Sequence, residues 1–513
     1  MAKLKRESFE WALIHLTSFY DSDFYPLLFE FKAIKHDWNN ILPVLLEIDI
    51  DTYAPKMPFI SAAPKSDGSC RVVHQLDPID SLIYTALAYE HALNIEAARI
   101  PVERHIAFSY RINPDTKGSF FDTNRNGYGL FLNKAEELAG EKKEGYVLMT
   151  DLVDFYNQIY LHRVSNILEE AGSINCKDFE KFLLGLNNNI SKGIPVGPAP
   201  SIIISEAILS DIDNKIIRHN ESFVRYADDI YIFFSDKIAA QRFLSNLTLY
   251  LHSNHRLVLS SEKTRIITTV EFLEKHLKIE DVLEKQRLHS KLREIQSDIY
   301  PLPEKQPAFE ELDNNEKFKL RAEIYKELFL ESISFEKIDL GLMRHILRQA
   351  GNYKIRIIIP LIFKHFDTLI PVLREIVSFF LKVLNEKTAK RFEEEFSLLL
   401  EKPYLSDSFI NIWIFTLFQD DSFNNTNIKI DYNKVNRIRE RALIAKRSHD
   451  KTWVKDIKDG IDTLGPWDKR AVIDSAIVLS KDECLHWLGL IASKGELVEK
   501  SICAKVISDK KAE

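Results

Sequence analysis

Cysteine, glycine and proline are all scarce in this sequence, and each shortage excludes a class of protein. The 513 residues include four cysteines, widely spaced and without a CxxC pair, so neither a disulfide framework nor a zinc site is indicated. The 16 glycines and 18 prolines make up about 7% of the chain, against about 12% in an average protein. So few turn-forming residues favour long helices and argue against an all-β sandwich.

Long apolar runs and an excess of positive charge are also missing. Segments such as 230–234 (IYIFF) fall far below the roughly 20 apolar residues of a membrane span, and Glu7 and Glu10 interrupt the stretch where a signal peptide would be apolar. The formal net charge is -7, whereas proteins that grip long duplexes through phosphates usually carry a basic excess. We therefore expect a cytoplasmic protein without a membrane span, whose contacts with nucleic acid are local.

The first half of the chain divides into two regions by pattern. Residues 1–55 are predicted to form a helical segment that packs on the region after it. Four apolar residues recur on one face of that helix: Phe9, Leu13, Leu16 and Tyr20. Residues 56–285 mix short apolar strands with helices and glycine-containing loops, which is typical of an α+β domain.

Residues 290–513 contain amphipathic helices separated by prolines and no comparable strand pattern. Stacked helical hairpins of the HEAT kind and a plain helical bundle both fit this pattern, and the succession of helix pairs favours the repeat, although no repeat of fixed period is evident. The predicted fold is therefore an α+β region followed by an all-α, HEAT-like domain.

The strongest chemical signal is an acidic pair between two short apolar strands. Tyr226, Ala227, Asp228 and Asp229 lie where a tight hairpin is expected. Phosphoryl transfer with two divalent metals needs carboxylates held on rigid backbone, and such a hairpin supplies them. An ordinary acidic turn is the alternative, because aspartate is favoured in turns by local hydrogen bonding.

A third carboxylate follows an apolar strand further upstream. Asp151 comes directly after the segment 146–149 (YVLM), and a carboxylate at the end of a buried strand is costly unless a cation or a partner compensates it. We expect Asp151 to bridge both metals together with Asp228. A helix N-cap is the other interpretation of Asp151.

A loop rich in glycine and proline lies between these two acidic elements. Gly193 and Gly197 allow the backbone to approach a ligand closely. Ser201 lies near the start of the following helix, where backbone donors and the helix dipole favour a phosphate or a template strand. The loop is therefore a candidate nucleotide-binding element.

The order of these elements resembles the palm of the reverse transcriptase family. The elements are the strand before Asp151, the Gly-Pro loop with its helix, the YADD hairpin and the segment 257–266 (LVLSSEKTRI). The resemblance covers roughly residues 55–275. It implies reverse-transcriptase-like fingers and palm, nucleotidyl transfer with two Mg²⁺ ions (or Mn²⁺), and three metal-binding carboxylates: Asp151, Asp228 and Asp229.

The same resemblance implies roles for four further side chains. Tyr156 corresponds to an aromatic residue that stacks under the incoming sugar and clashes with a 2′-hydroxyl, so dNTPs are the implied substrates. Lys263 corresponds to a lysine that assists the leaving pyrophosphate as an acid. Lys65 and Arg71 lie on the two sides of a predicted hairpin, where the family clamps a triphosphate, although a hairpin with solvated cations is the alternative.

Two features depart from most reverse transcriptases. Val196 stands where most of them carry a glutamine in the Gly-Pro loop, and no basic thumb follows the palm. Both features match the bacterial abortive-infection (Abi) polymerases, and in length the chain is similar to the smaller, prophage-encoded member of that group. The similarity implies antiphage defence in the bacterial cytoplasm, DNA synthesis without a template, homo-oligomerisation, and a single-stranded product attached covalently to a tyrosine of the enzyme.

The sequence does not identify the priming residue among its 18 tyrosines. A primer must reach the metals from a mobile segment or from the helical domain, so four candidates remain open: Tyr20, Tyr25, Tyr53 and Tyr300. Most tyrosines are half-buried packing residues, and each candidate has that alternative.

Three functions follow from these observations. The leading hypothesis is an Abi-type, untemplated and protein-primed DNA polymerase, with a phage factor as its trigger. The second is a conventional RNA-templated reverse transcriptase of a retron or another defence system. The third is an inactive palm that serves as a scaffold, against which the three intact carboxylates argue.

Overall fold

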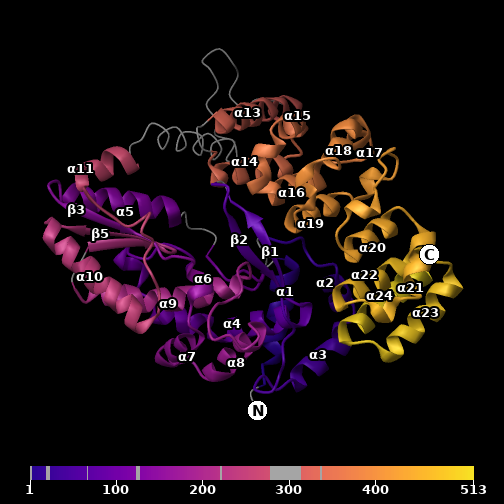
Figure 1. Cartoon of the computed structure of the whole chain (residues 1–513), viewed down its shortest axis with the longest axis horizontal. Helices are drawn as coiled ribbons and strands as arrows, with labels where there is room; N and C mark the ends of the chain where they lie inside the picture. The colour runs from indigo at the N-terminus through magenta and orange to yellow at the C-terminus, as the bar shows by residue number, and fades with distance from the viewer. Residues whose placement is uncertain are drawn as a thin grey trace. The chain divides into compact units, whose positions relative to one another are not determined.

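The computed structural model describes residues 3–18, 24–65, 67–122, 127–219, 222–277, 314–334 and 338–512. They belong to two compact units (Figure 1). The first comprises Met1–Asp23, Leu27–Ile60 and Val73–Ile279, and the second Phe24–Pro26, Ser61–Val72 and Glu280–Glu513. The N-terminal helices thus cluster in one unit with most of the α+β region, and the predicted domain boundaries stay a prediction.

The N-terminal part of the first unit is helical. Helix α1 (Arg6–Ser18) buries Phe9, Leu13 and Leu16 and packs against the long helix α4 (Pro78–Ala98), which confirms the predicted apolar face. Tyr20, the fourth residue of that predicted face, lies outside the described residues. Two shorter helices follow α1: α2 (Glu30–His36) and α3 (Trp38–Glu47).

The core of the first unit is a four-stranded antiparallel sheet with the strand order β4-β5-β3-β6. Its strands are β3 (Tyr146–Thr150), β4 (Ser222–Tyr226), β5 (Asp229–Phe234) and β6 (Arg265–Thr268). A separate hairpin pairs β1 (Phe59–Pro64) with β2 (Cys70–Gln75). The mixed α+β pattern predicted for this region is therefore confirmed.

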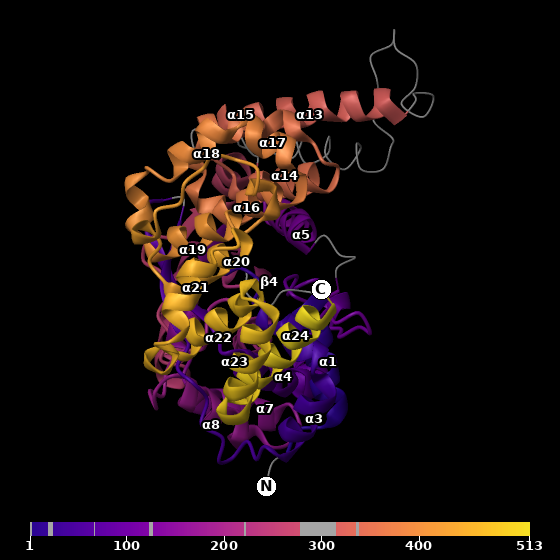
Figure 2. The same ribbon diagram turned by 90° about the vertical axis from the view of Figure 1, so that its right-hand side faces the viewer.

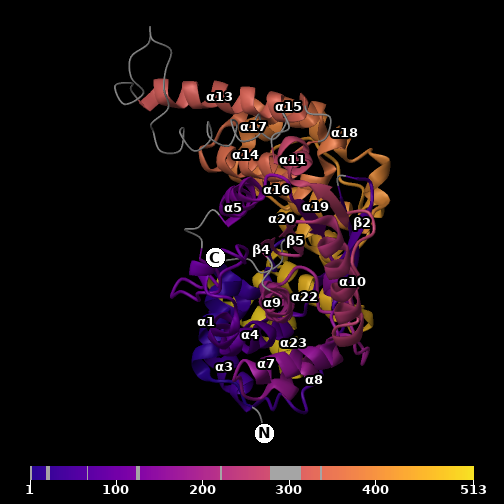
Figure 3. The ribbon, with the colours of Figure 1, turned by 90° about the vertical axis from the view of Figure 1, so that its left-hand side faces the viewer.

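Alternation along the strands divides the side chains between the two faces of the sheet. On one face, Val147, Val224 and Phe233 pack with α5 (Gly127–Glu141) and α11 (Thr269–Phe272). On the other, Phe234 contacts Phe243 of α10 (Lys237–Asn254). Figures 1 and 3 show α5 and α10 on opposite sides of the strands. Helices therefore cover both faces of the sheet at its central strands, whereas the edge strand β6 stays partly exposed.

The remaining helices of the first unit connect the strands. They are α6 (Phe155–Gln158), α7 (Leu161–Glu170), α8 (Cys176–Leu186) and α9 (Ala199–Ile217). Helix α9 packs against α4, and α7 against both α8 and α9.

The second unit is helical beyond residue 290 and has no strand there within its described residues, as predicted. Its helices are α13 (Asn314–Ser334), α14 (Leu340–Asn352), α15 (Ile359–Lys364), α16 (Leu373–Val383), α17 (Glu386–Arg391), α18 (Glu393–Leu399), α19 (Ser408–Leu417), α20 (Ile438–Arg447), α21 (Lys451–Lys458), α22 (Pro466–Ser475), α23 (Lys481–Lys494) and α24 (Leu497–Ala512).

These helices pack in succession (Figure 2). Helix α14 contacts α16, which contacts α19, and the row continues through α20, α22 and α24. Because helices close in sequence pack against one another along this row, the arrangement fits stacked helical pairs. The HEAT-like interpretation of these pairs stays a prediction. No helix in the described part of the chain is long and apolar enough to cross a membrane.

A buried carboxylate lies in the first turn of α4. Asp80 is fully buried and accepts hydrogen bonds from the Tyr53 hydroxyl (2.7 Å) and the Lys56 backbone amide (2.9 Å). Burial, together with the negative charge of Asp77, raises the pKa of Asp80 to about 7. Since this pKa exceeds the ordinary value of 3.8, the folded protein binds the proton more tightly than the unfolded chain does.

We expect Asp80 to make the folded protein less stable as the pH rises. Its stabilising contribution is fully present below pH 4 and is lost as the pH rises through about 7, by roughly 1.4 kcal/mol for each unit of pKa shift. Urea unfolding of the wild type and of Asp80→Asn between pH 5 and pH 8 measures this effect. The wild type should lose stability over this range more steeply than the variant, and equal slopes would contradict the prediction.

Candidate active site

The acidic pair lies in a tight turn, as predicted. Strand β4 ends at Tyr226 and β5 begins at Asp229, and these two residues pair directly, so that only Ala227 and Asp228 form the connection. Ala227 has a φ of 50°, in the left-handed region that residues other than glycine rarely adopt. This conformation places Asp228 and Asp229 at the end of the sheet, where both are half-buried.

Strand pairing brings Asp151 to the same place. Strands β3 and β5 are antiparallel, with Thr150 opposite Ile230, so Asp151, directly after β3, lies beside Asp229 at the start of β5. Asp151 is only 7% exposed, and its backbone carbonyl accepts a hydrogen bond of 2.8 Å from the Ser260 amide. The three predicted carboxylates therefore converge, although they come from distant parts of the chain.

Lys263 joins this group because β6 pairs with the other edge of β3. Its Nζ lies 2.7 Å from Oδ2 of Asp151 and 3.9 Å from Oδ1 of Asp229. Burial lowers the pKa of Lys263, but the hydrogen bond and the charge of Asp151 outweigh it, so the net shift is upward. Lys263 is thus a protonated counterion of the carboxylates.

One ammonium does not balance three carboxylates. Burial and the charge of Asp151 raise the pKa of Asp228 to about 7, which shows how strongly the site resists a further negative charge. The Oδ1 atom of Asp151 is buried and has no hydrogen-bond partner among the described residues. An orphaned buried acceptor costs about 1–3 kcal/mol, which a bound cation would offset.

Carboxylate oxygens are the ligands that Mg²⁺ prefers, so Asp151, Asp228 and Asp229 fit such an ion by their chemistry. As the side chains lie, no three His, Cys, Asp or Glu residues in the described ranges are arranged to hold a metal. The ammonium of Lys263 contacts Asp151 and lies near Asp229 in this arrangement. A divalent ion would have to displace that ammonium from at least one of them.

Tyr156, on α6, is attached to the Gly-Pro loop. Its carbonyl accepts a hydrogen bond of 3.0 Å from the Ile194 amide, and its hydroxyl lies 3.4 Å from Oγ of Ser205. Gly193 and Gly197 have φ values of 93° and 129°, which only glycine adopts without strain. The loop is therefore fixed against α6, and α6 begins four residues after Asp151.

His74 is a contact of this loop that sequence reasoning missed. The His74 amide donates to the Val196 carbonyl, and the Val196 amide donates to Nδ1 of His74, both at 3.0 Å. Burial lowers the pKa of His74 to about 4, so the ring is neutral and its Nδ1 accepts. Both backbone groups of Val196, the residue in place of the family's glutamine, are thus bonded to His74 of β2, one to its amide and one to its ring, and the Val196 side chain is buried.

Ser201 differs from its predicted role. Its side chain is fully buried, and its Oγ lies 2.9 Å from the Tyr84 hydroxyl of α4. A phosphate would not reach this hydroxyl without displacing Tyr84, because the group is inside the protein. If the loop binds a nucleotide, as predicted, its backbone and not the Ser201 hydroxyl would make the contact.

Lys65 and Arg71 lie on the hairpin of β1 and β2, and both are exposed. The Lys65 amide donates to the Ser69 carbonyl at 2.8 Å, which closes the turn. Neither cation forms an ion pair within the part of the chain that the structure describes. Both belong to the second unit, and the triphosphate clamp stays a prediction.

Two of the four candidate priming tyrosines are described. Tyr25 is fully buried, its hydroxyl lies 2.6 Å from Oγ of Ser61, and burial raises its pKa to about 12. Tyr53 donates its hydroxyl to Asp80. Both hydroxyls are thus engaged, and priming at either would require that contact to break. Tyr20 and Tyr300 lie outside the described residues.

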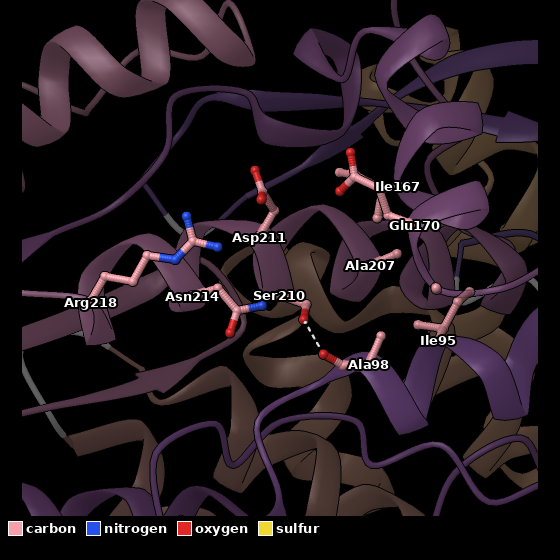
Figure 4. A pocket seen from close by; sticks show the side chains of 10 residues that line it. Ile95, Ala98, Ile167, Glu170, Ala207, Ser210, Asp211, Asn214 and Arg218 are labelled. Carbon is pink, nitrogen blue, oxygen red and sulfur yellow. Dashed lines mark hydrogen bonds between the residues drawn. The ribbon is translucent and has the colours of Figure 1, made fainter.

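A separate crevice of about 250 Å³ is lined by α4, α7 and α9 and contains none of the predicted site residues (Figure 4). Its most connected residue is Asp211, whose Oδ2 accepts from Arg163 (3.1 Å), Tyr250 (2.6 Å) and His255 (2.8 Å). This cluster connects α7, α9 and α10, which gives it a structural role.

One known protein family matches part of this chain. Residues 63–280 match the family described as "Reverse transcriptase (RNA-dependent DNA polymerase)", whose domains use divalent metal ions such as Mg²⁺. No curated protein matches the chain.

Two solved structures of telomerase are similar to this chain, with low sequence identity and low TM-scores. Telomerase from Candida albicans with a fragment of telomeric RNA is 11% identical, with a TM-score of 0.32, over 67% of this chain and 64% of that one. Apo telomerase from Candida Tropicalis is 12% identical, with a TM-score of 0.34, over 71% of this chain and 68% of that one. Similarity at this level supports no inference about function.

We expect Asp151→Asn to reduce nucleotide incorporation by about a thousandfold or more, because stabilisation of transition-state charge by a metal is worth several kcal/mol and about 1.4 kcal/mol changes a rate tenfold. Steady-state incorporation of labelled dNTPs measures this loss. Asp154→Asn is the matched control: Asp154 is exposed, its φ of 48° suits asparagine, and its contact with Asn157 needs only Oδ1. Equal losses in both variants would contradict the assignment.

Proposed function

We propose that this chain, which carries a reverse transcriptase domain and is a nucleotidyltransferase of the DNA polymerase class, synthesises DNA from dNTPs without a template and with a protein primer in antiphage defence of the abortive-infection type. The observation that carries the catalytic part is the convergence of Asp151, Asp228 and Asp229 at the ends of β3 and β5. The defence role rests on the Abi resemblance.

The site supports nucleotidyl transfer by its charges. Asp151, Asp228 and Asp229 would hold the metal ions, which when bound lower the pKa of an attacking hydroxyl and neutralise phosphate charge. Lys263 holds a proton at Nζ beside Asp151 and is the group available to protonate the leaving pyrophosphate. Tyr156 is half-buried beside the Gly-Pro loop, the position from which the family excludes a 2′-hydroxyl.

The loop geometry supports synthesis without a template. Most reverse transcriptases place a glutamine side chain where this chain has Val196, whose side chain is buried and whose backbone is paired with His74. No polar side chain is therefore available at this position to contact the incoming nucleotide and its template. After the palm, helices replace the basic thumb that would grip a templated duplex.

Protein priming is chemically reasonable, because a phenol with a pKa of about 10 is deprotonated more easily than a sugar hydroxyl. The product would then be single-stranded DNA attached covalently to the enzyme. The proposal also includes a homo-oligomer and a phage factor, which rest on the Abi resemblance. It further includes a cytoplasmic location in a bacterium.

An RNA-templated reverse transcriptase is the second candidate. The match of residues 63–280 is equally compatible with it, and a neutral loop position does not prevent base pairing from selecting the nucleotide. An inactive scaffold is a third, against which the intact carboxylates and the orphaned Oδ1 of Asp151 argue.

We expect the purified chain to become labelled when it is incubated with Mg²⁺ and radioactive dNTPs without nucleic acid. The label should migrate with the protein on a denaturing gel, be released by protease, and be absent from the double variant Asp228→Ala, Asp229→Ala. Mass spectrometry of the labelled peptide would then identify the priming tyrosine.

Addition of an RNA template with a DNA primer separates the two polymerase hypotheses. Products that extend the supplied primer and copy its template, with no label on the protein, would replace untemplated synthesis by conventional reverse transcription. Antiphage protection that persists in the double variant would instead favour the scaffold.

A further inference from the structure

A buried ion network lies directly behind the turn that carries Asp228 and Asp229. Its centre is Arg225 in β4, whose side chain is fully buried. Asp213 on α9 accepts from the Nε (2.8 Å) and from the NH2 (2.7 Å) of Arg225, a bidentate arrangement that fixes the plane of the guanidinium. Sequence reasoning missed this arginine, although a charge inside an apolar strand (SFVRY) is the signal that marks it.

The same guanidinium holds the backbone of the catalytic turn. NH1 of Arg225 donates a hydrogen bond of 3.0 Å to the carbonyl of Ala227, two residues further along the chain. Ala227 is the residue in the left-handed conformation, and its carbonyl belongs to the peptide that leads into Asp228. The orientation of that peptide is therefore coupled to the position of Arg225.

A second carboxylate completes the set of acceptors. Glu206 on α9 accepts from NH2 (3.0 Å) and NH1 (3.4 Å) of Arg225. Together with Asp213 and the Ala227 carbonyl, it provides an acceptor for each of the five N–H groups of the guanidinium. The planar fork of arginine matches these acceptors, and the ammonium of a lysine would not.

Glu206 also connects the network to a second arginine. Arg99, at the end of α4, donates to Glu206 at 2.7 Å and to the carbonyls of Ser109 and Tyr110 at 2.9 and 2.8 Å. The two guanidiniums outweigh the effect of burial and keep the pKa of Glu206 below its ordinary value. Arg99 therefore shares a carboxylate with Arg225 and does not bond to Ala227.

We propose that Arg225 is a positioning residue for metal binding: anchored by Asp213 and Glu206, it holds the left-handed Ala227 turn in the conformation that presents Asp228 and Asp229 to a divalent cation. The pairing of β4 with β5 keeps the strands together in the absence of this contact, but it does not determine how the peptide before Asp228 is oriented. An alanine rarely adopts a positive φ by itself, so the turn needs such an external anchor.

The inference rests on the metal-binding role of Asp228 and Asp229, and the test separates the two. Mn²⁺ binding to the full-length chain, without nucleotide, is measured by electron paramagnetic resonance for the wild type, Arg225→Lys, Arg99→Lys and Asp228→Asn. Mn²⁺ affinity that is unaffected by Asp228→Asn would contradict the metal site itself. A loss in Asp228→Asn confirms the site and makes the arginine variants informative.

Arg225→Lys should raise the dissociation constant for Mn²⁺ about tenfold or more and raise the Mg²⁺ concentration for half-maximal incorporation in the same proportion. Arg99→Lys is the matched control, because it also removes a buried guanidinium from Glu206. It should lower the melting temperature to a similar extent and leave the Mn²⁺ dissociation constant within about twofold of the wild type. Similar Mn²⁺ affinities in the two variants would overturn the proposal and leave Arg225 a purely structural residue.

A milder variant keeps the test decisive if Arg225→Lys does not fold. Asp213→Asn weakens the anchor of Arg225 alone, since Asp213 bonds with its side chain only to Arg225 among the described residues. In the folded Asp213→Asn protein, a rise of a few-fold in the Mn²⁺ dissociation constant is the expected result. An unchanged constant would refute the positioning role.

Discussion

Three carboxylates that repel one another lie at the ends of neighbouring strands, and much of the first unit compensates for that repulsion. Antiparallel pairing of β3 with β5 brings Asp151 beside Asp229, and pairing with β6 supplies the ammonium of Lys263. Burial and the remaining negative charge of Asp151 together raise the pKa of Asp228, and the Oδ1 of Asp151 lacks a hydrogen-bond partner among the described residues. A site with these properties favours a divalent cation, and this preference connects the fold with nucleotidyl transfer.

Two cations lie near the turn, and their surroundings differ. The side chain of Lys263 is exposed, and its ammonium contacts the carboxylate of Asp151. The guanidinium of Arg225 is sealed in the protein, where its two carboxylate partners and the Ala227 carbonyl leave it no alternative position. The exposed Lys263 is thus suited to contact a substrate, and the buried Arg225 to hold the turn in one conformation.

The Gly-Pro loop combines a backbone path set by glycine with an apolar residue, Val196, at the position of the family's glutamine. Glycine at 193 and 197 gives the loop its path, and the pairing of Val196 with the neutral His74 fixes it against β2. The loop therefore has a fixed backbone path, while its side chain at position 196 is apolar and buried. In the proposed function, a loop without a polar side chain at this position suits a polymerase that adds nucleotides without a template.

The sequence alone determined the elements whose signals are local. The acidic hairpin, the strand before Asp151 and the apolar face of α1 follow from alternation and helical spacing, because each depends on residues close together in the chain. Tertiary structure alone decided which distant groups meet: Ser201 with Tyr84, Val196 with His74, and Arg225 with Glu206 and Asp213. A buried serine and an exposed one have the same sequence pattern, and a charge in an apolar run does not name its partner. Those pairings are set by how α4, α9 and the sheet pack together, which no local pattern encodes.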